Sequence, residues 1–195
     1  RRDGSASLPA NFPNRITINY GGSGYDIEDT GYRLSQGNIS IEGMEIEIVN
    51  YYDDHAFLAG AAWTGGGFTN SSLTDETFSK GSLTGQVVAT TDGRRLYSSF
   101  YYNDRGLLAD ERHSTLDGDV YKVYTSCTFT DKPSVVTKVI PGHSAGNDYT
   151  ITHNYQYNRN NDQLQMDAVI LGSVGGSTSR VLSVLTYNDL GQLEN

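Results

Sequence analysis

A short motif that recurs along the chain constrains its fold more than any other feature. In its clearest copy, residues 101 to 108 read Tyr-Tyr-Asn-Asp-Arg-Gly-Leu-Leu. The aromatic pair favours a strand, Asn103 and Asp104 have short side chains that hydrogen-bond a local turn, and Gly106 supplies the positive φ that such a turn requires. The leucines then begin a returning strand. This octet predicts a β-hairpin, and its recurrence predicts a chain built from hairpins.

Three further copies keep the order of aromatic residue, polar turn and leucine. The last copy along the chain retains the turn glycine, whereas the copies at residues 51 to 58 and 155 to 164 replace it. Ala56 stands at the glycine position in the first of these, and Asn160 or Asn161 is expected to adopt the left-handed conformation in the other. The predicted structural positions of the turns are Tyr52, Asp53, Tyr102, Asn103, Asp104, Gly106, Tyr157, Asn158, Tyr187, Asn188, Asp189 and Gly191.

The segments between the motifs read as strands. Apolar and polar residues alternate between turn signals, which predicts an antiparallel meander from about residue 82 onward. Asp-Gly pairs at residues 92–93 and 117–118 predict two more hairpin turns. Residues 1–14 are predicted to be an extended lead-in, and residues 59–80 a loop or insertion. The 195 residues are thus predicted to form a single all-β domain, a twisted strip of hairpins with little helix.

The charge of the chain excludes several classes of partner. Its 14 lysine and arginine residues against 23 acidic residues give a net charge of -9, whereas nucleic acids and anionic membranes bind to concentrated basic surfaces. No stretch approaches the roughly 20 apolar residues that span a bilayer, so membrane insertion is not expected. The single cysteine, Cys127, excludes an internal disulfide and a multi-cysteine zinc site, and its neighbours predict a buried strand position.

Three groups of polar residues superficially suggest catalytic or metal sites. Asp53, Asp54 and His55 are consecutive, so on a strand they point to opposite faces and do not converge on one ion. Residues 117–119 lack the later acidic ligands of a calcium loop. Residues 143–148 contain a histidine, a serine and an aspartate, the residue types of a hydrolase triad. The Gly-x-Ser-x-Gly motif of a strained nucleophile elbow is absent, so the sequence does not support a triad there. The sequence therefore predicts no enzyme, no catalytic or metal residue and no cofactor.

Aromatic side chains are the remaining functional candidates, because tyrosine and tryptophan have flat faces that can stack on sugar rings. The motif tyrosines recur at the strand end before each turn, and cross-strand packing is the favoured explanation for them. Trp63 lies beside three glycines in the predicted loop, where packing and glycan contact stand as equal alternatives. Trp63 is therefore the candidate glycan contact of the chain.

The order of these landmarks resembles that of a known family. The four motif copies, the Leu-Thr-Gly-Gln-Val step at residues 83–87 and the Phe-Thr-Asp-Lys-Pro turn at residues 129–133 resemble Rhs/YD-repeat proteins. The resemblance is specifically to the large secreted type found in Bacteroides-like bacteria. It covers roughly residues 9 to 195 and is strongest from residue 81 onward.

This resemblance carries implications for fold and setting. It implies a long antiparallel β-ribbon that spirals into a strip or hollow shell, secreted or associated with the bacterial cell wall and surface, which in some members encloses a C-terminal toxin. Carbohydrate or cell-surface binding is also implied. The chain lacks the C-terminal core and self-cleavage region of the family, so no protease activity is carried over to it.

Two functions of different classes follow as expectations. In the first, the chain is a structural repeat segment, a scaffold or shell without chemistry of its own, whose partners are adjacent repeats and a C-terminal toxin domain. In the second, it is a module that binds surface polysaccharide through exposed aromatic side chains. The sequence begins without an initiator methionine or an apolar signal segment, and it is therefore interpreted as a fragment of a longer secreted or surface protein.

Overall fold

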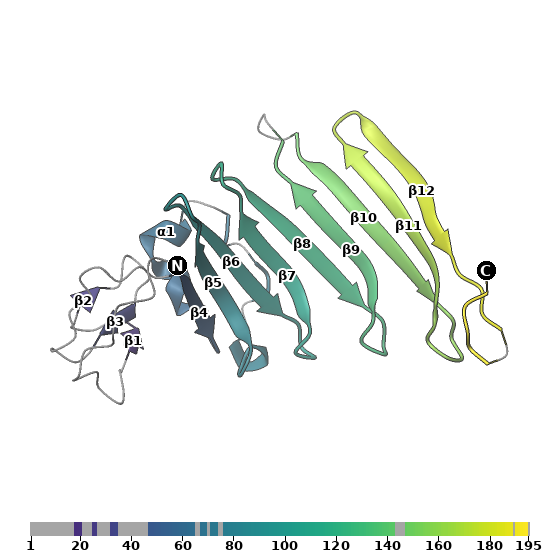
Figure 1. Ribbon diagram of the computed structural model, residues 1–195, viewed down its shortest axis with the longest axis horizontal. Coiled ribbons are helices and arrows are strands. Elements are labelled where there is room, and N and C mark those ends of the chain that lie inside the picture. The colour runs from purple at the N-terminus through teal and green to yellow at the C-terminus, as the bar shows by residue number, and fades with distance from the viewer. Residues whose placement is uncertain are drawn as a thin grey trace, which may run out of the picture.

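The chain folds into an open sheet in which each strand pairs with its neighbours in the sequence. This computed structural model describes residues 18–20, 25–26, 32–34, 47–64, 67–69, 71–73, 76–142, 147–188 and 190–194. Nine antiparallel strands form a single layer that does not close (Figure 1). They are β4 (Ile48–Tyr52), β5 (Leu83–Ala89), β6 (Arg95–Tyr102), β7 (Leu108–Ser114), β8 (Val120–Cys127), β9 (Pro133–Ile140), β10 (Tyr149–Tyr157), β11 (Leu164–Ser173) and β12 (Gly176–Val184). The predicted all-β antiparallel meander is confirmed.

Three shorter strands precede this sheet along the chain. β1 (Ile18–Tyr20), β2 (Tyr25–Asp26) and β3 (Tyr32–Leu34) pair antiparallel in the order β1-β3-β2. The predicted lead-in of residues 1–14 lies outside the described residues. Asp189 lies outside them too, as do His143 and Ser144, which were considered above as members of a hydrolase triad.

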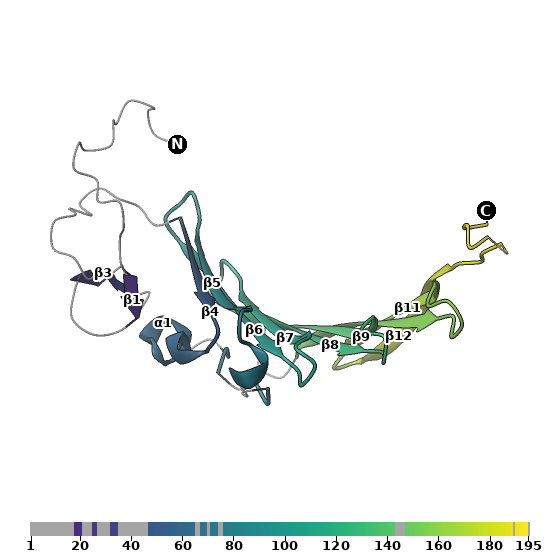
Figure 2. The ribbon, with the colours of Figure 1, turned by 90° about the horizontal axis from the view of Figure 1, so that it is seen from below.

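Four of the strands that run into the turns along the lower end of Figure 1, namely β4, β6, β8 and β10, share an irregularity just before the turn. Their register shifts by one residue between positions 51 and 52, 101 and 102, 126 and 127, and 156 and 157. Such β-bulges increase the local right-handed twist of a strand pair. Figure 2 shows the sheet twisted and bowed along its length. The repeated motif therefore carries a bulge as well as a turn.

The octet folds as the sequence predicts, with Gly106 at the positive-φ position. The Asn103 N–H donates to the Leu107 carbonyl at 2.9 Å, and the Gly106 N–H donates to the Asn103 carbonyl at 2.9 Å. The Asn103 side chain accepts hydrogen bonds from the N–H groups of Arg105 and Leu107. Gly106 has φ +71°. Asn103 therefore organises the turn from within, and Gly106 allows the chain to reverse.

The turn after β12 repeats this geometry. The Asn188 N–H donates to the Gln192 carbonyl at 3.0 Å, and the Gly191 N–H donates to the Asn188 carbonyl at 2.8 Å. The Asn188 side chain again accepts from two N–H groups further along the turn, and Gly191 has φ +75°. The predicted equivalence of these two copies therefore extends to individual hydrogen bonds.

Two other turns reach the same geometry without glycine. In residues 128–132, Thr128 takes the asparagine position and Asp131 adopts φ +64°. The turn of residues 158–163 is one residue longer, and its positive-φ residue is Asp162, at φ +56°. The expectation that Asn160 or Asn161 would be left-handed is wrong, because the extra residue shifts that position toward the returning strand.

The first copy of the motif corrects the sequence alignment. Ala56 does not occupy the glycine position but begins a 3-10 helix. The Asp53 N–H donates to the Ser82 carbonyl at 3.2 Å, and Gly81, at φ +78°, donates its N–H to the Asp53 side chain at 2.6 Å. Tyr52 pairs with the first residue of β5 as Tyr102 pairs with the first residue of β7. The closing hydrogen bond is therefore kept, with the chain between Asp53 and Gly81 inserted into the turn, but the backbone differs from that of the octet because Asp53 itself has φ +72°.

The insertion packs on one face of the sheet and forms the hydrophobic core. It contains the short helices η1 (Ala56–Ala59), α1 (Ala61–Thr64) and η2 (Glu76–Phe78), and Figure 2 shows α1 beside the sheet near β4. The buried cluster combines side chains of the insertion with those of the strands beneath it: Tyr51, Phe57, Trp63, Phe68, Val87 and Val120. The predicted loop at residues 59–80 is thus part of an insertion that folds against β4 to β8.

Trp63 lies at the centre of this cluster and is 1% exposed. Its ring contacts Phe57, Phe68 and Tyr97 edge to face, at centroid distances of 4.7, 5.2 and 5.1 Å. A buried ring has no free face for a sugar, so Trp63 is a packing residue and its assignment as a glycan contact is wrong. The neighbouring glycines suggested an exposed loop, whereas the Trp63 side chain packs inward against the sheet.

Cys127 and its neighbourhood also differ from the expectation of a core position. Cys127 is half-buried at the end of β8, and Phe129, which has the same alternation phase, is 98% exposed at a turn tip. The alternation of buried and exposed side chains does not extend from Cys127 to Phe129, because the bulge and the turn interrupt the two-residue period of the strand.

Replacing Trp63 by alanine tests where the core lies. We expect Trp63→Ala to lower the free energy of unfolding by about 3–5 kcal/mol, because it opens a cavity between the insertion and the sheet. The matched control, Phe129→Ala, removes a solvent-exposed ring and should change it by less than about 0.5 kcal/mol. Urea denaturation followed by circular dichroism measures both, and a small loss at Trp63 would place the core elsewhere.

Replacing Gly106 by valine tests the octet turn. The nearest atom to a Cβ there is 3.9 Å away, so the cost comes from the left-handed backbone and not from a clash. We expect Gly106→Val to destabilise the chain by about 1–3 kcal/mol. Ala56→Val, in an exposed helical turn, should cost less. Thermal melts of both variants measure the difference, and equal small shifts would contradict a glycine-dependent turn.

Candidate functional site: the turn row and the pocket beside the insertion

The repeated turns lie side by side along one end of the sheet, at the lower end in Figure 1. We call this end the turn row; it comprises residues 53 and 81–82, 103–107, 128–132, 158–163 and 188–192. Each turn is closed by a backbone hydrogen bond of the same kind, and the first four turns each follow a bulge. All of the predicted motif residues that the structure describes belong to this row or to the strand ends beside it.

The last tyrosine before a turn ties its hairpin to the preceding one. Its hydroxyl donates to the carbonyl of the first residue of the neighbouring strand. The three bonds, which we call tyrosine clasps, join Tyr102 to Leu83 at 2.7 Å, Tyr157 to Pro133 at 2.9 Å and Tyr187 to Leu164 at 2.9 Å. The hydroxyl groups of these three motif tyrosines therefore each have a specific acceptor on the neighbouring strand.

Burial affects the ionisation of the clasp hydroxyls. Desolvation raises the pKa of Tyr102 and of Tyr157 above the ordinary tyrosine value. A raised pKa in the folded state means that the neutral phenol is favoured by folding. The stabilisation from the clasps is therefore fully present below the ordinary tyrosine pKa and is lost as the pH rises through the folded value.

Long polar side chains connect each turn to the next. Arg105 donates to the Thr128 carbonyl at 3.0 Å and pairs with Asp131 at 2.7 Å. Lys132 donates in the same direction to the Asp162 carbonyl. Each of these partners lies in the next turn of the row, Thr128 at its start and Asp131 and Asp162 at the positive-φ position of their turns. The turns therefore form a ladder parallel to the ladder of strands.

The ladder continues at the end of the described sheet. The Gln163 side chain donates to the carbonyl of Gly191, the positive-φ residue of the last turn, at 2.9 Å. Each of these exposed contacts contributes little alone, typically less than about 1 kcal/mol, but their repetition fixes the spacing of the turns.

Two strand ends lack a tyrosine clasp. Cys127 occupies the tyrosine position on β8 and has no hydroxyl to reach across to β7. Tyr52 occupies it on β4, which is an edge strand, and its side chain is 53% exposed with no hydroxyl partner among the described residues. The clasp therefore appears only where a tyrosine has a neighbouring strand within the described sheet.

A buried ion pair anchors the insertion to the sheet. Arg112 and Asp110 on β7 have side chains 2% and 5% exposed, and their charged groups are 3.0 Å apart. The Arg112 guanidinium also donates to the Gly67 carbonyl at 2.6 Å, and the Tyr101 hydroxyl donates to the Phe68 carbonyl. Two polar side chains of the sheet thus satisfy backbone carbonyls of the insertion, which keeps that segment in place.

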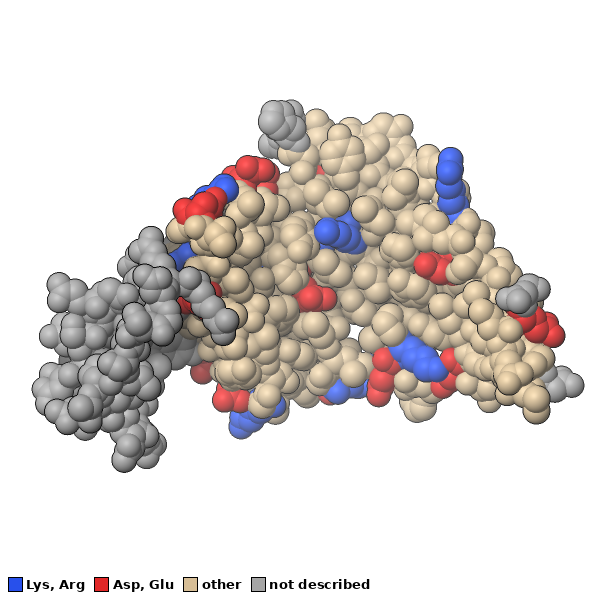
Figure 3. All heavy atoms as spheres, in the orientation of Figure 1, with Lys and Arg blue, Asp and Glu red and all other residues tan. Residues whose placement is uncertain are grey.

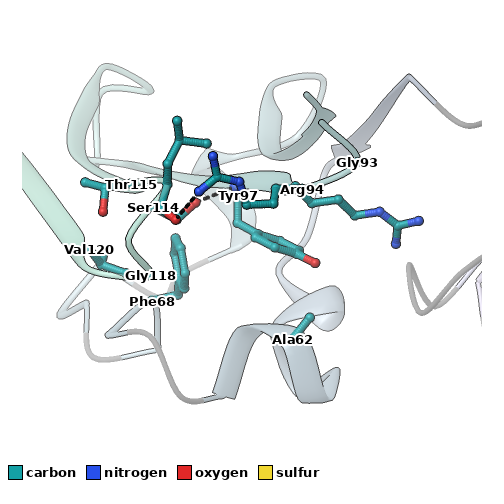
Figure 4. Close-up of a pocket in the computed structure, with 11 residues that line it drawn as sticks. Ala62, Phe68, Gly93, Arg94, Tyr97, Ser114, Thr115, Gly118 and Val120 are labelled. Atoms are coloured by element: carbon teal, nitrogen blue, oxygen red, sulfur yellow. Dashed lines mark hydrogen bonds between the residues drawn. The ribbon is translucent and has the colours of Figure 1, made fainter. Parts of the chain in front are cut away.

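A pocket of about 570 Å³ lies at the end of the sheet opposite the turn row. Its floor is formed by Tyr97, Ser114 and Val120, from three adjacent strands, and Phe68 of the insertion contributes a second ring. Figure 4 shows Ala62 of α1 facing the ring of Tyr97 across the pocket. The turns of residues 90–94 and 115–119 form the remaining rim. Nothing in the sequence pattern pointed to this pocket, because the insertion that helps to shape it has no periodicity.

The consecutive residues Asp53, Asp54 and His55 do not converge on one point. Asp53 binds the Gly81 N–H, Asp54 binds the Ala56 N–H, and His55 donates to the Phe100 carbonyl at 2.9 Å. These consecutive residues therefore have three separate structural tasks. No cluster of histidine, cysteine, aspartate or glutamate side chains that could hold a metal ion occurs within the described part of the chain.

The face of the sheet in Figure 3 carries scattered charges over the central strands and more of them along the turn row.

Ser98, His113 and Tyr121 face one another on β6, β7 and β8. The Ser98 hydroxyl is 2.9 Å from His113 Nδ1, and the His113 and Tyr121 rings stack at 5.0 Å. Backbone N–H groups within a sheet bond neighbouring strands, so this pair lacks the free donors that acyl transfer requires. It provides a flat aromatic surface.

Comparisons with protein-family models, with curated proteins and with solved structures found no match to this chain. Among the described residues, no helix is long and apolar enough to cross a membrane.

Tyrosine-to-phenylalanine substitutions test the clasps. We expect Tyr102→Phe and Tyr157→Phe each to lower the free energy of unfolding by about 0.5–1.5 kcal/mol, since each removes one hydrogen bond and leaves the ring in place. Tyr52→Phe is the matched control and should be neutral, because its hydroxyl lies at the open edge. Chemical denaturation of the purified variants provides the values. An equal loss at Tyr52, or no loss at the other two, would contradict the clasp.

Proposed function

We propose that the chain is a structural segment of a longer repeat-built scaffold and performs no chemistry itself. The observation that carries the proposal is the regular ladder of turns, clasps and turn-to-turn contacts, whose residues connect one hairpin to the next. A side chain that bonds the neighbouring hairpin keeps the two hairpins in register. Because each hairpin makes contacts of the same kind to the next, the sheet can be extended by adding further repeats.

The two edges of the sheet support extension by further hairpins. Within the described sheet β12 pairs only with β11, and its side chains Val181, Leu182 and Val184 are 57%, 55% and 69% exposed. An apolar edge strand of this length is a template for another strand. On the β4 edge, Tyr52 has the position from which the other motif tyrosines clasp a preceding strand. The partners proposed for both edges are therefore hairpins of the same repeat.

The wider setting is proposed from the resemblance of the motifs to Rhs/YD-repeat proteins. A strip of such hairpins fits the wall of a β-spiral shell in a secreted or cell-surface bacterial protein, and a C-terminal toxin domain is the cargo that this resemblance suggests. The twist and bulge in each repeat give a strip that curves as it grows, which is what a shell wall requires.

A carbohydrate-binding module is the alternative, and one observation favours it. Tyr121 lies half-buried on the open face, with the Lys138 ammonium 4.1 Å from its ring centre and the His113 ring stacked beside it. A flat ring next to hydrogen-bond donors is suited to sugars. If glycans bind this chain, the open face around Tyr121 replaces Trp63 as the contact.

Self-association through the sheet edge tests the scaffold proposal. We expect the purified chain to associate as its concentration rises, because the apolar β12 edge can pair with a second strand. Substituting Val181→Lys together with Leu182→Lys should abolish association. Leu116→Lys, in a turn at the opposite end of the strands, is the matched control and should not. Size-exclusion chromatography with light scattering measures the mass.

Two outcomes would contradict this expectation. If the chain stays monomeric at every concentration, the β12 edge does not pair with further strands and no longer supports the scaffold proposal. Association that the Leu116→Lys control abolishes equally would show that the contact lies elsewhere. If the chain is monomeric and binds bacterial polysaccharide in a manner lost on Tyr121→Ala, the carbohydrate-binding alternative replaces the scaffold.

A further inference from the structure

We propose that the open edge of β12 binds an extended strand that runs antiparallel to β12 and carries a carboxylate opposite Arg180. This edge lies at the end of the sheet nearest the C-terminus (Figure 1). The inference rests on the scaffold function, because it specifies the strand that extends the sheet there. It adds the orientation and the charge of that strand, neither of which the scaffold role requires.

The first residues of an antiparallel strand already lie on this edge. The Leu185 N–H donates to a carbonyl of β11 at 2.9 Å, whereas the Thr186 carbonyl accepts from the Glu194 N–H, on the other side of the chain, at 2.8 Å. Tyr187 and Leu193 form an antiparallel bridge beside this bond. Within the described sheet, the rest of β12 pairs with β11 alone. A strand on the outer side of β12 would therefore continue an antiparallel pairing that has begun.

Arg180 gives the edge its charge. It is the single charged residue of β12, and its side chain is exposed without an ion-pair or hydrogen-bond partner among the described residues. Val169, the residue opposite it on β11, has no charge. The one acidic side chain of β11, Asp167, already lies 3.1 Å from His153 Nδ1. Arg180 therefore remains available to a carboxylate on the outer side of the edge.

A second copy of the same edge fits less well. Arg180 is the central residue of the nine in β12, so antiparallel pairing of two copies along the whole strand places the two Arg180 side chains opposite each other. Like charges directly opposite one another destabilise a strand pair, and opposite charges stabilise it. Exposed Val181, Leu182 and Val184 favour pairing with any strand, whereas Arg180 favours an acidic one. Self-association of the chain is therefore weaker than pairing with an acidic strand.

Two synthetic peptides with the β11 sequence, residues 164–173, test the charge preference. They carry Val169→Glu or Val169→Gln, because Val169 is the β11 residue that pairs with Arg180. We expect the Val169→Glu peptide to bind the folded chain about threefold more tightly, since the two differ only in a charge opposite Arg180. Two-dimensional NMR titrations measure both Kd values, and the amide shift changes should centre on Gly176–Val184.

A nitroxide at the N-terminus of the Val169→Glu peptide tests the orientation. In an antiparallel pair this end lies beside Val184, so the Val184 amide signal should broaden more than that of Gly176. Greater broadening at Gly176 would show a parallel pairing and contradict the proposal.

Variants of the chain locate the charge that selects the peptide. Arg180→Gln should abolish the difference between the two peptides. Lys138→Gln is the matched control, because it removes a positive charge from β9 on the same face of the sheet, and it should leave the difference unchanged. Circular dichroism confirms that each variant is folded.

The proposal is overturned if neither peptide binds, if both bind equally, or if Arg180→Gln strengthens both alike. The last result would mean that Arg180 only disfavours strand pairing at the edge. These outcomes are separate from those of the scaffold test. A chain that associates with itself but binds both peptides equally contradicts the role of Arg180 alone, whereas a monomeric chain that prefers the Val169→Glu peptide removes support from the scaffold and keeps this role.

Discussion

A backbone hydrogen bond that closes each turn fixes the rest of this structure. In the octet it runs from the Asn103 N–H to the Leu107 carbonyl, and the same bond recurs at residues 128, 158 and 188. In the first hairpin it joins Asp53 to Ser82 and is retained although a long segment lies between them. Because this bond determines which residues of two strands face each other, it also places the tyrosine that clasps the preceding strand.

The balance of forces differs between the two halves of the sheet. Beneath the insertion, buried rings and the Asp110–Arg112 pair provide a conventional core. From β9 to β12 no second layer covers the sheet among the described residues, and its apolar side chains other than Val169 are half-buried or exposed. Strand pairing, clasps and turn-to-turn contacts must therefore supply more of the stability there. An uncovered sheet of this kind is suited to extension and exposed to association at its edge.

The parts of the fold that depend on local backbone chemistry could be predicted from the sequence. Gly106 and Gly191 have the positive φ expected of them, since the residues around each turn determine it. The wrong assignment of Ala56 arose because the partner of Asp53, Gly81, is separated from it by the insertion, and a motif search along the chain assumes contiguity. The positive φ of Asp53, Asp131 and Asp162 was missed because aspartate adopts φ > 0 only where the turn imposes it.

The functional features depend on tertiary contacts and were harder to predict. Trp63 beside glycines suggested an exposed loop, yet four rings of the insertion and the sheet surround it. The pocket brings together residues of three strands and the insertion, so no local pattern marks it. The clasp acceptors are backbone carbonyls, which every residue carries, and only the register of the folded sheet shows which of them a tyrosine reaches.

Amide hydrogen exchange tests the central claim most directly, namely that the turns and clasps hold the uncovered half of the sheet without a second layer. The amides of residues 103, 128, 158 and 188 close successive turns from the covered half to the uncovered half. The account predicts that all four exchange more slowly than unstructured amides by about a hundredfold or more. Protection at residue 103 alone, with rapid exchange at the other three, would show that the sheet depends on the insertion core and would contradict the account.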